Sequence, residues 1–200
     1  MAGIHGIGPP TETLGGDIAL FEHSYAKHFP EQINIVTFAI LSMNDTIQLI
    51  TVTTPEQIEM IRTLFLEYQQ WLNFSLCFQG FDKELAELPG KYAPPLGRLY
   101  LVNCNGQTAG CIALRPMEEE GVCELKRLYV REQFRGNGIG KYLTKTILSD
   151  AAEIGYRTMR LDTLQRMETA RGLYTSLGFT VIPAYYHNPL EEVVYMELAI

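Results

Sequence analysis

From about residue 46, the spacing of apolar residues predicts alternating strands and helices. Residues 46–53 alternate and are rich in β-branched side chains, which is typical of a strand. Thr54, Pro55 and Gln57 follow as a capping box with proline at the first helical position, and they predict the start of a helix. Apolar residues then recur at helical spacing along one face: Ile58, Ile61, Leu64, Phe65, Tyr68 and Leu72.

The rest of the chain continues this mixture. Helices are expected at 81–88, 138–154 and 166–177, and strands at 98–103, 108–115, 122–130, 158–163, 180–183 and 193–198. Asn105-Gly106 between the first two of these strands is a strong hairpin signal. The order predicts an α/β (α+β mixed) fold with three antiparallel strands in its middle, and it fits neither a helical bundle nor a barrel.

Residues 1–42 follow a different pattern. The first 16 are punctuated by glycine and proline without an apolar period, which predicts disorder. Residues 17–43 have room for a short helix and a strand. Because Met43 stands just before the first clear strand, we expect a functional domain at 43–200. Residues 1–42 are then a flexible or accessory N-terminal extension.

Composition narrows the class of protein. The chain has 200 residues, 46% of them hydrophobic, which suits one globular domain with its own core. Acidic residues outnumber basic ones 23 to 16, and this balance argues against general nucleic-acid binding. Four cysteines without a C-x-x-C pair are expected to be reduced core thiols of a cytoplasmic protein: Cys77, Cys104, Cys111 and Cys123. They predict neither a disulfide framework nor a metal site.

The longest apolar stretch, residues 33–43, is much shorter than the roughly 20 residues of a membrane-spanning helix. It also lies behind an acidic leader that contains glycine and proline, unlike the apolar core of an export signal. We therefore expect no membrane association.

Candidate chemistry is concentrated in a basic segment. Residues 126–145 contain six lysines and arginines against the single acid Glu132. A solvated basic face would explain such a run. Within it, however, Gly136, Gly138 and Gly140 stand at alternate positions between a predicted strand and a predicted helix. Glycines there let the backbone approach a ligand closely, and the amides of a helix N-terminus favour phosphate.

Two familiar phosphate-binding motifs do not fit. A P-loop needs four residues between its glycines and a Ser/Thr after its lysine, whereas this segment has three residues between Gly136 and Gly140, and Tyr142 follows Lys141. A dinucleotide motif needs G-x-G-x-x-G, which the alternate glycines do not provide.

The segment does resemble the acyl-coenzyme A loop of the GNAT N-acetyltransferase superfamily. Its R/Q-x-x-G-x-G/A signature corresponds to residues 135–140, RGNGIG. The preceding ELKRLYV at 124–130 is similar to the family's fourth strand, and ARGLYTSLGF at 170–179 is similar to its fourth helix. The resemblance covers about residues 45–200. It implies a central mixed, mostly antiparallel sheet flanked by helices and splayed between the fourth and fifth strands.

The resemblance also implies where acetyl-coenzyme A binds. In this family the cofactor enters the gap between the splayed strands, next to a bulge, and adjacent Lys126-Arg127 fits such a bulge. Strand backbone would pair with the pantetheine, and loop amides would hold the pyrophosphate. The implied cofactor-binding residues are Leu128, Tyr129, Val130, Arg135, Gly136, Asn137, Gly138, Ile139, Gly140 and Lys141. No metal is expected.

Acetyl transfer needs a neutral amine and a proton donor for the leaving thiolate. The resemblance suggests Glu124 as the base, although a structural partnership with Lys126 or Arg127 is an equal alternative. It suggests Tyr174 as the donor, against the alternative of a core aromatic. Cys123, next to Glu124, is interpreted as core and not as a nucleophile.

The predicted function is transfer of an acetyl group from acetyl-coenzyme A to a primary amine of a small molecule, peptide or protein. Attack is direct, in a ternary complex of a monomer or homodimer. The net negative charge mildly favours a cationic amine. Residues suggested to line the acceptor site are Trp71, Phe74, Tyr185, Tyr186 and His187, with a surface-loop position the main alternative for His187. The competing interpretation is a non-catalytic acyl-coenzyme A sensor.

Overall fold

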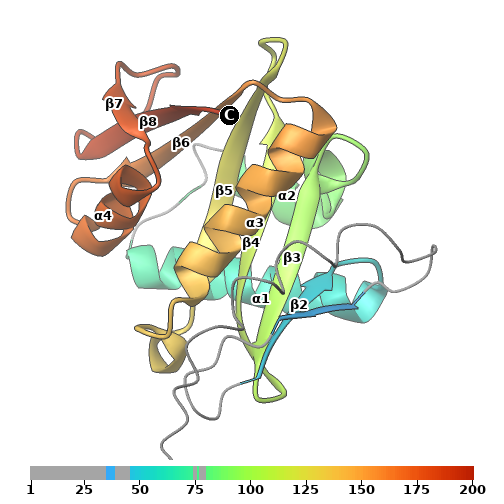
Figure 1. Ribbon diagram of the computed structural model, residues 1–200. Helices are drawn as coiled ribbons and strands as arrows, with labels where there is room; N and C mark the ends of the chain where they lie inside the picture. The colour runs from blue at the N-terminus through green and yellow to red at the C-terminus, as the bar shows by residue number, and fades with distance from the viewer. Residues whose placement is uncertain (1–34, 39–45, 74–75, 77–79) are drawn as a thin grey trace, which may run out of the picture. The chain divides into compact units, whose positions relative to one another are not determined.

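The computed structural model describes residues 35–38, 46–73, 76 and 80–200, with only the backbone considered for 35–38 (Figure 1). All of these residues belong to one compact unit, Asn34–Ile200. The unit contains eight strands in one sheet of order β1-β2-β3-β4-β5-β6-β8-β7. The strands are β1 (Ile35–Phe38), β2 (Ile47–Thr51), β3 (Arg98–Cys104), β4 (Gln107–Pro116), β5 (Val122–Val130), β6 (Thr158–Leu164), β7 (Thr180–Ile182) and β8 (Val193–Ala199).

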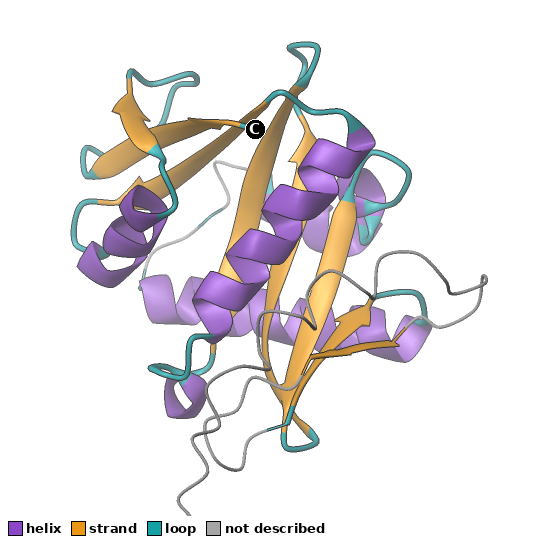
Figure 2. Ribbon diagram, viewed as in Figure 1, coloured by secondary structure: helices purple, strands orange, loops and turns teal. Residues whose placement is uncertain are grey.

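The sheet is antiparallel except between β5 and β6, and helices cover both of its faces (Figure 2). One face carries α1 (Pro55–Leu72) and α2 (Phe81–Glu87), and the other carries α3 (Ile139–Ile154) and α4 (Glu168–Ser176). Two short 3-10 helices, η2 (Gly90–Tyr92) and η3 (Glu132–Phe134), complete the elements. The predicted mixed, mostly antiparallel fold is confirmed.

Local signals explain the helices. At the start of α1 the Thr54 hydroxyl accepts a hydrogen bond from the Gln57 amide, and the Gln57 side chain accepts one from the Thr54 amide, so the capping box is formed. The helix ends at Asn73, which adopts the left-handed conformation. On the opposite face, α3 buries Ile139, Leu143, Ile147 and Ala151 against the sheet, as their spacing predicts.

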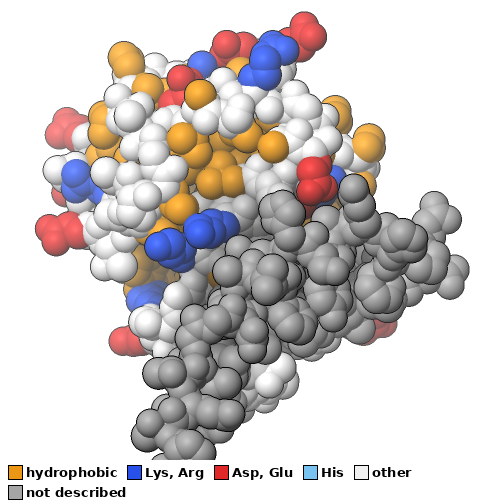
Figure 3. Space-filling model, viewed as in Figure 1, with side chains coloured by type: hydrophobic (Ala, Val, Ile, Leu, Met, Phe, Trp, Pro, Cys, Tyr) orange, Lys and Arg blue, Asp and Glu red, His pale blue; other side chains and the backbone are white. Residues whose placement is uncertain are grey.

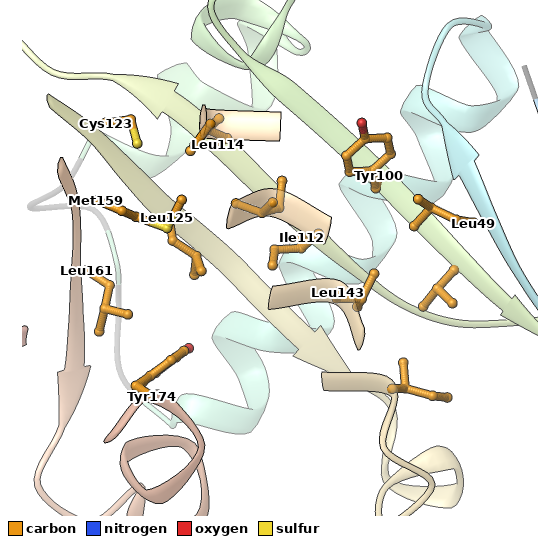
Figure 4. Packing of buried hydrophobic residues seen from close by; sticks show 14 of the residues in the cluster. Leu49, Tyr100, Ile112, Leu114, Cys123, Leu125, Leu143, Met159, Leu161 and Tyr174 are labelled. Atoms are coloured by element: carbon orange, nitrogen blue, oxygen red, sulfur yellow. The ribbon is translucent and has the colours of Figure 1, made fainter. Parts of the chain in front are cut away.

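The two apolar clusters differ in position. Figure 4 shows the cluster on the α3 face, where Leu143 packs near Ile112 and Leu125 from the sheet. The second cluster joins α1 and α2 to the other face, around Phe65 and Phe81, which are both fully buried. A group of basic side chains lies beside apolar surface in the space-filling view (Figure 3).

Strands β5 and β6 separate after a short paired stretch. They pair at only three positions, ending at Glu124 opposite Arg160. Just beyond, Arg127 and Leu128 of β5 oppose the single residue Ile112 of β4, and Arg127 has φ 57°. This is the bulge predicted at Lys126-Arg127, and it bends β5 away from its neighbour. The strands expected to separate are the family's fourth and fifth. They correspond to β5 and β6 of this chain, because β1 comes before the family's first strand.

Part of the proposed N-terminal extension contributes a strand. β1 pairs with β2 in antiparallel register, with Ile35 opposite Ile50. The compact unit is Asn34–Ile200, and the functional domain boundary at residue 43 stays a prediction. Most of residues 1–42 lie outside the described residues, so a flexible or accessory role for that segment stays a prediction. No helix in the described part of the chain has the length and hydropathy needed to cross a membrane.

Candidate active site

A cavity of about 840 Å³ opens where β5 and β6 separate. Its wall runs from the C-terminal part of β5 through the glycine loop to the start of α3, and then to α4 and the end of α1. All of the predicted cofactor-binding residues line it except Asn137. The splay, the loop and the α4 sequence therefore meet around one space, although they are separate in the sequence.

The glycine loop presents the N-terminus of α3 to this cavity. Gly136 and Gly138 have φ values of 85° and 74°, a conformation that favours glycine. Gly138 is the N-cap of α3, and no side chain caps it among the described residues. The first amides of α3 are consequently suited to an anion.

Arg135 joins this loop to α1 at the cavity wall. Its Nε donates to the carbonyl of Val130 at 2.8 Å, and its guanidinium carbon lies 4.7 Å from the centre of the Trp71 ring. Trp71 is 45% exposed and stacks on Tyr68, with ring centres 6.3 Å apart. Trp71, predicted in the acceptor site, thus lines the cavity close to the cofactor loop.

Tyr174 lines the cavity from α4 and is only 5% exposed. Its ring packs against Phe179, and Figure 4 shows the hydroxyl directed away from α4 toward the sheet. Within the described part of the chain, this hydroxyl has no hydrogen-bond partner. Burial raises the Tyr174 pKa well above its ordinary value, and nearby Tyr68 and Asp162 raise it further. The hydroxyl is therefore a protonated donor that faces the cavity.

Glu124 lies outside the cavity lining, and its side chain is 2% exposed. Its Oε2 accepts from Nε and Nη2 of Arg115 at 2.7 and 2.6 Å. Its Oε1 accepts from the Tyr185 hydroxyl at 2.9 Å and lies 3.6 Å from Nζ of Lys126. The structure thus gives Glu124 the partner Lys126, and its role as a base stays a prediction.

The predicted acceptor residues are divided. Tyr185 and Tyr186 do not line the cavity but pack against Tyr195, with ring centres 5.0 and 5.4 Å apart. His187 does not line it either, and Phe74 lies outside the described residues. Tyr185 and Tyr186 instead hydrogen-bond Glu124 and Asp162, respectively. They hold one carboxylate in the cavity wall, that of Asp162, and one outside the lining, that of Glu124.

Sequence reasoning missed the ion pair inside the cavity. Nζ of Lys126 lies 2.7 Å from Oδ1 of Asp162, and both residues line the cavity. Burial raises the Asp162 pKa, but Lys126 and the Tyr186 hydroxyl outweigh burial and leave it below its ordinary value. An acidic residue inside the apolar strand 158–164 was the available signal.

The described cysteines match the expectation of core thiols. Cys104, Cys111 and Cys123 are buried, and burial raises the Cys123 pKa to about 12. Cys77 lies outside the described residues. Across the described ranges, no group of His, Cys, Asp and Glu side chains is arranged to hold a metal ion.

Splayed strands, a bulge and a glycine loop at a helix N-terminus define the class of acyl-coenzyme A-dependent transferases. A family model described as "Acetyltransferase (GNAT) domain" matches residues 95–181. An uncharacterised N-acetyltransferase of Schizosaccharomyces pombe is 41% identical over 153 residues, which is 76% of this chain and 94% of that protein. Another, from Dictyostelium discoideum, is 31% identical over 67% of this chain and 90% of that protein.

The same fold is found in a solved structure. The RimL ribosomal L7/L12 α-N-protein acetyltransferase, in complex with coenzyme A, superposes with a TM-score of 0.62. The two are 17% identical, and the match covers 82% of this chain and 98% of that one. This chain belongs to the GNAT family and is an N-acetyltransferase. The resemblance drawn from the sequence is confirmed.

Proposed function

We propose that this N-acetyltransferase uses acetyl-coenzyme A to acetylate a primary amine of a small molecule, peptide or protein, by direct attack in a ternary complex. The observation that carries the proposal is the cavity itself. It extends from the glycine loop, along the part of β5 that has separated from β6, to Tyr174. The coenzyme A in the RimL relative supports the choice of cofactor.

Coenzyme A fits the two ends of this cavity. Beyond Glu124, no described residue pairs with β5 on its β6 side, so backbone groups near Leu128 and Val130 are available to the pantetheine amides. The pyrophosphate would rest on the amides of residues 135–141 at the start of α3. Lys141 and Arg135 add positive charge there.

The reaction itself needs few groups. A neutral amine attacks the thioester carbonyl carbon, the C–S bond breaks, and the thiolate takes a proton. Tyr174 supplies that proton in our proposal, because its hydroxyl is protonated and without a partner among the described residues. Holding amine and thioester together supplies much of the remaining acceleration.

The fate of the amine proton stays open to experiment. Glu124 is the base that the resemblance suggests. Arg115 and Tyr185 engage its oxygens, and Lys126, which lines the cavity, lies 3.6 Å from its Oε1. These contacts favour a supporting role in which Glu124 holds Lys126.

Net negative charge supports a cationic acceptor, and Asp162 provides an anionic group in the cavity wall. We further propose that the protein is cytoplasmic and is a monomer or homodimer. In this proposal it acts independently of nucleic acid and membranes. The alternative is a non-catalytic acyl-coenzyme A sensor. A sensor would not need the Tyr174 hydroxyl as a proton donor.

Turnover with a panel of amines tests the proposal. Amino acids, polyamines, aryl amines and short peptides would be incubated with acetyl-coenzyme A, and both thiol release and the acetylated product would be measured. We expect turnover of at least one class that Tyr174→Phe lowers. Calorimetric binding of acetyl-coenzyme A without transfer to any amine would support the sensor instead.

A further inference from the structure

Lys126 is itself a primary amine in the cavity wall of an enzyme that acetylates amines. Its side chain is only 5% exposed and lies where β5 and β6 begin to separate. Lys141 is the other lysine in the cavity wall, at the glycine loop. Any amine within reach of the thioester is a potential acceptor, so the contacts that hold Lys126 matter.

The thioester of the donor would lie at the end of the cavity that holds Lys126. With the pyrophosphate at the glycine loop, the pantetheine extends back along β5 toward the point of separation. Lys126 is four residues before Val130, roughly 13 Å along an extended strand. Tyr174, the proposed donor to the thiolate, is close enough to Asp162 for that carboxylate to raise its pKa. The Lys126–Asp162 pair and the leaving sulfur therefore belong to the same end.

Two carboxylates hold the Lys126 ammonium. Asp162 Oδ1 lies 2.7 Å from its Nζ, and Glu124 Oε1 lies 3.6 Å from it. Each carboxylate is fixed by another donor, since the Tyr186 hydroxyl binds Asp162 Oδ2 at 2.9 Å and Arg115 binds Glu124. The Nζ of Lys126 is thereby held by carboxylates that are themselves fixed in place.

We propose that the ion pair with Asp162, supported by Glu124, holds the Lys126 amine in place and so prevents the enzyme from acetylating its own active site. Lys126 becomes an acetylation site when the charge on Asp162 is lost. Released from the pair, Nζ would then attack the thioester carbon as an unprotonated amine, forming an N–C bond and breaking the C–S bond. The nitrogen loses a proton, the thiolate gains one, and the products are acetyl-lysine and free coenzyme A. This inference rests on the proposed use of acetyl-coenzyme A.

The test is incubation of the full chain with acetyl-coenzyme A alone, followed by peptide mass spectrometry. Asp162→Asn is the test variant because it keeps the shape of the side chain and removes its charge. We expect acetylation of Lys126 to be roughly tenfold or more faster than in the wild type. Lys141 and the exposed Lys83 serve as internal controls and should react at unchanged rates. Asp162→Asn combined with Lys126→Arg should show no added acetyl group at position 126.

Three results would overturn the inference. One is an Asp162→Asn variant that binds acetyl-coenzyme A but leaves Lys126 unmodified. Another is Lys126 acetylated equally fast in the wild type. The third is an Asp162→Asn variant that folds but no longer binds acetyl-coenzyme A, because the proposal places Asp162 beyond the cofactor seat.

A second variant guards against a folding defect. If Asp162→Asn fails to fold, Glu124→Gln removes the more distant carboxylate and should raise Lys126 acetylation in the same direction by a smaller factor. No rise in that variant would then contradict the inference. Calorimetry with the wild type separates a failure of this inference from a failure of the proposed function. If the wild type itself does not bind acetyl-coenzyme A, the proposed function fails, and the inference fails with it.

Discussion

The proposal gives two glycines and a tyrosine different roles in this site, and single substitutions can test these roles separately. Gly136 and Gly138 adopt a backbone conformation that L side chains rarely take, whereas Gly140 does not. Tyr174 contributes a hydroxyl. The loop should therefore govern binding of the donor, and Tyr174 should govern its cleavage.

Gly138→Val is expected to abolish detectable binding of coenzyme A in calorimetry while the protein stays folded. The added side chain is strained at φ 74° and stands where the pyrophosphate would meet the start of α3. Gly155→Val is the matched control, since Gly155 ends the same helix at φ 101° with open space around it. Wild-type affinity in Gly138→Val would refute the assignment of the loop.

Tyr174→Phe should lower turnover on the order of 10² without weakening binding of coenzyme A. The raised Tyr174 pKa keeps the hydroxyl protonated through neutral and mildly alkaline pH. The loss should thus be the same across that range, as measured in a pH–rate profile. Tyr100→Phe is the control, because Tyr100 is a buried tyrosine of the same cluster whose hydroxyl instead binds Asp150. Equal losses in both variants would indicate a packing effect.

Glu124→Gln separates a base from a structural carboxylate. If Glu124 accepts the amine proton, the loss of rate should shrink as pH rises, because more acceptor is already neutral. Given its contacts with Arg115 and Tyr185, we expect a profile parallel to that of the wild type. Stability should fall by about 1–3 kcal/mol in urea unfolding, since a charged hydrogen-bond partner is lost. Rescue at alkaline pH would contradict this expectation.

At the scale of elements, sequence patterns predicted most of what the structure contains. The α1 capping box, the inward face of α3, the Asn-Gly hairpin and the bulge at Lys126-Arg127 all have short-range causes, and all were found. Residues of the acceptor site were harder to predict from the sequence, because the positions of their side chains depend on long-range packing. Tyr185 and Tyr186 are in a loop by sequence, yet they pack against Tyr195 and bind carboxylates of two other strands.

The ion pair between β5 and β6 illustrates the same limit. Lys126 and Asp162 are 36 residues apart, and only the parallel pairing of their strands brings them together. Local periodicity reports which face a residue occupies but not which charge it meets there. A lysine in one strand and an aspartate in the other were the sequence signs of this pair, and further charged residues in both strands kept them from standing out.

At the scale of the whole molecule, the order of strands separates the cavity from the N-terminal edge of the sheet. β2, β3 and β4 lie between β1 and the strands that form the cavity. Changes at β1 should therefore affect the stability of the sheet edge more than the binding of the cofactor.

A chain that begins at Met43 lacks β1 and exposes the edge of β2. We expect it to fold and to bind coenzyme A with an affinity similar to that of a chain beginning at Asn34. Its melting temperature should be lower because one strand pairing is lost. Thermal unfolding and calorimetry on the two chains would measure this. Failure of the shorter chain to fold would make β1 an integral part of the domain.

The contact between Trp71 and Arg135 has an optical consequence. Trp71 is the single tryptophan of the chain, so the intrinsic emission excited at its absorption band comes from one place in the molecule. A guanidinium 4.7 Å from its ring belongs to the loop that would receive the pyrophosphate. Titration with coenzyme A should change the intensity or wavelength of that emission as Arg135 turns toward the anion. The same titration of Arg135→Ala should give a much smaller change. The wild-type protein would then report occupancy of its own cofactor site without an attached dye.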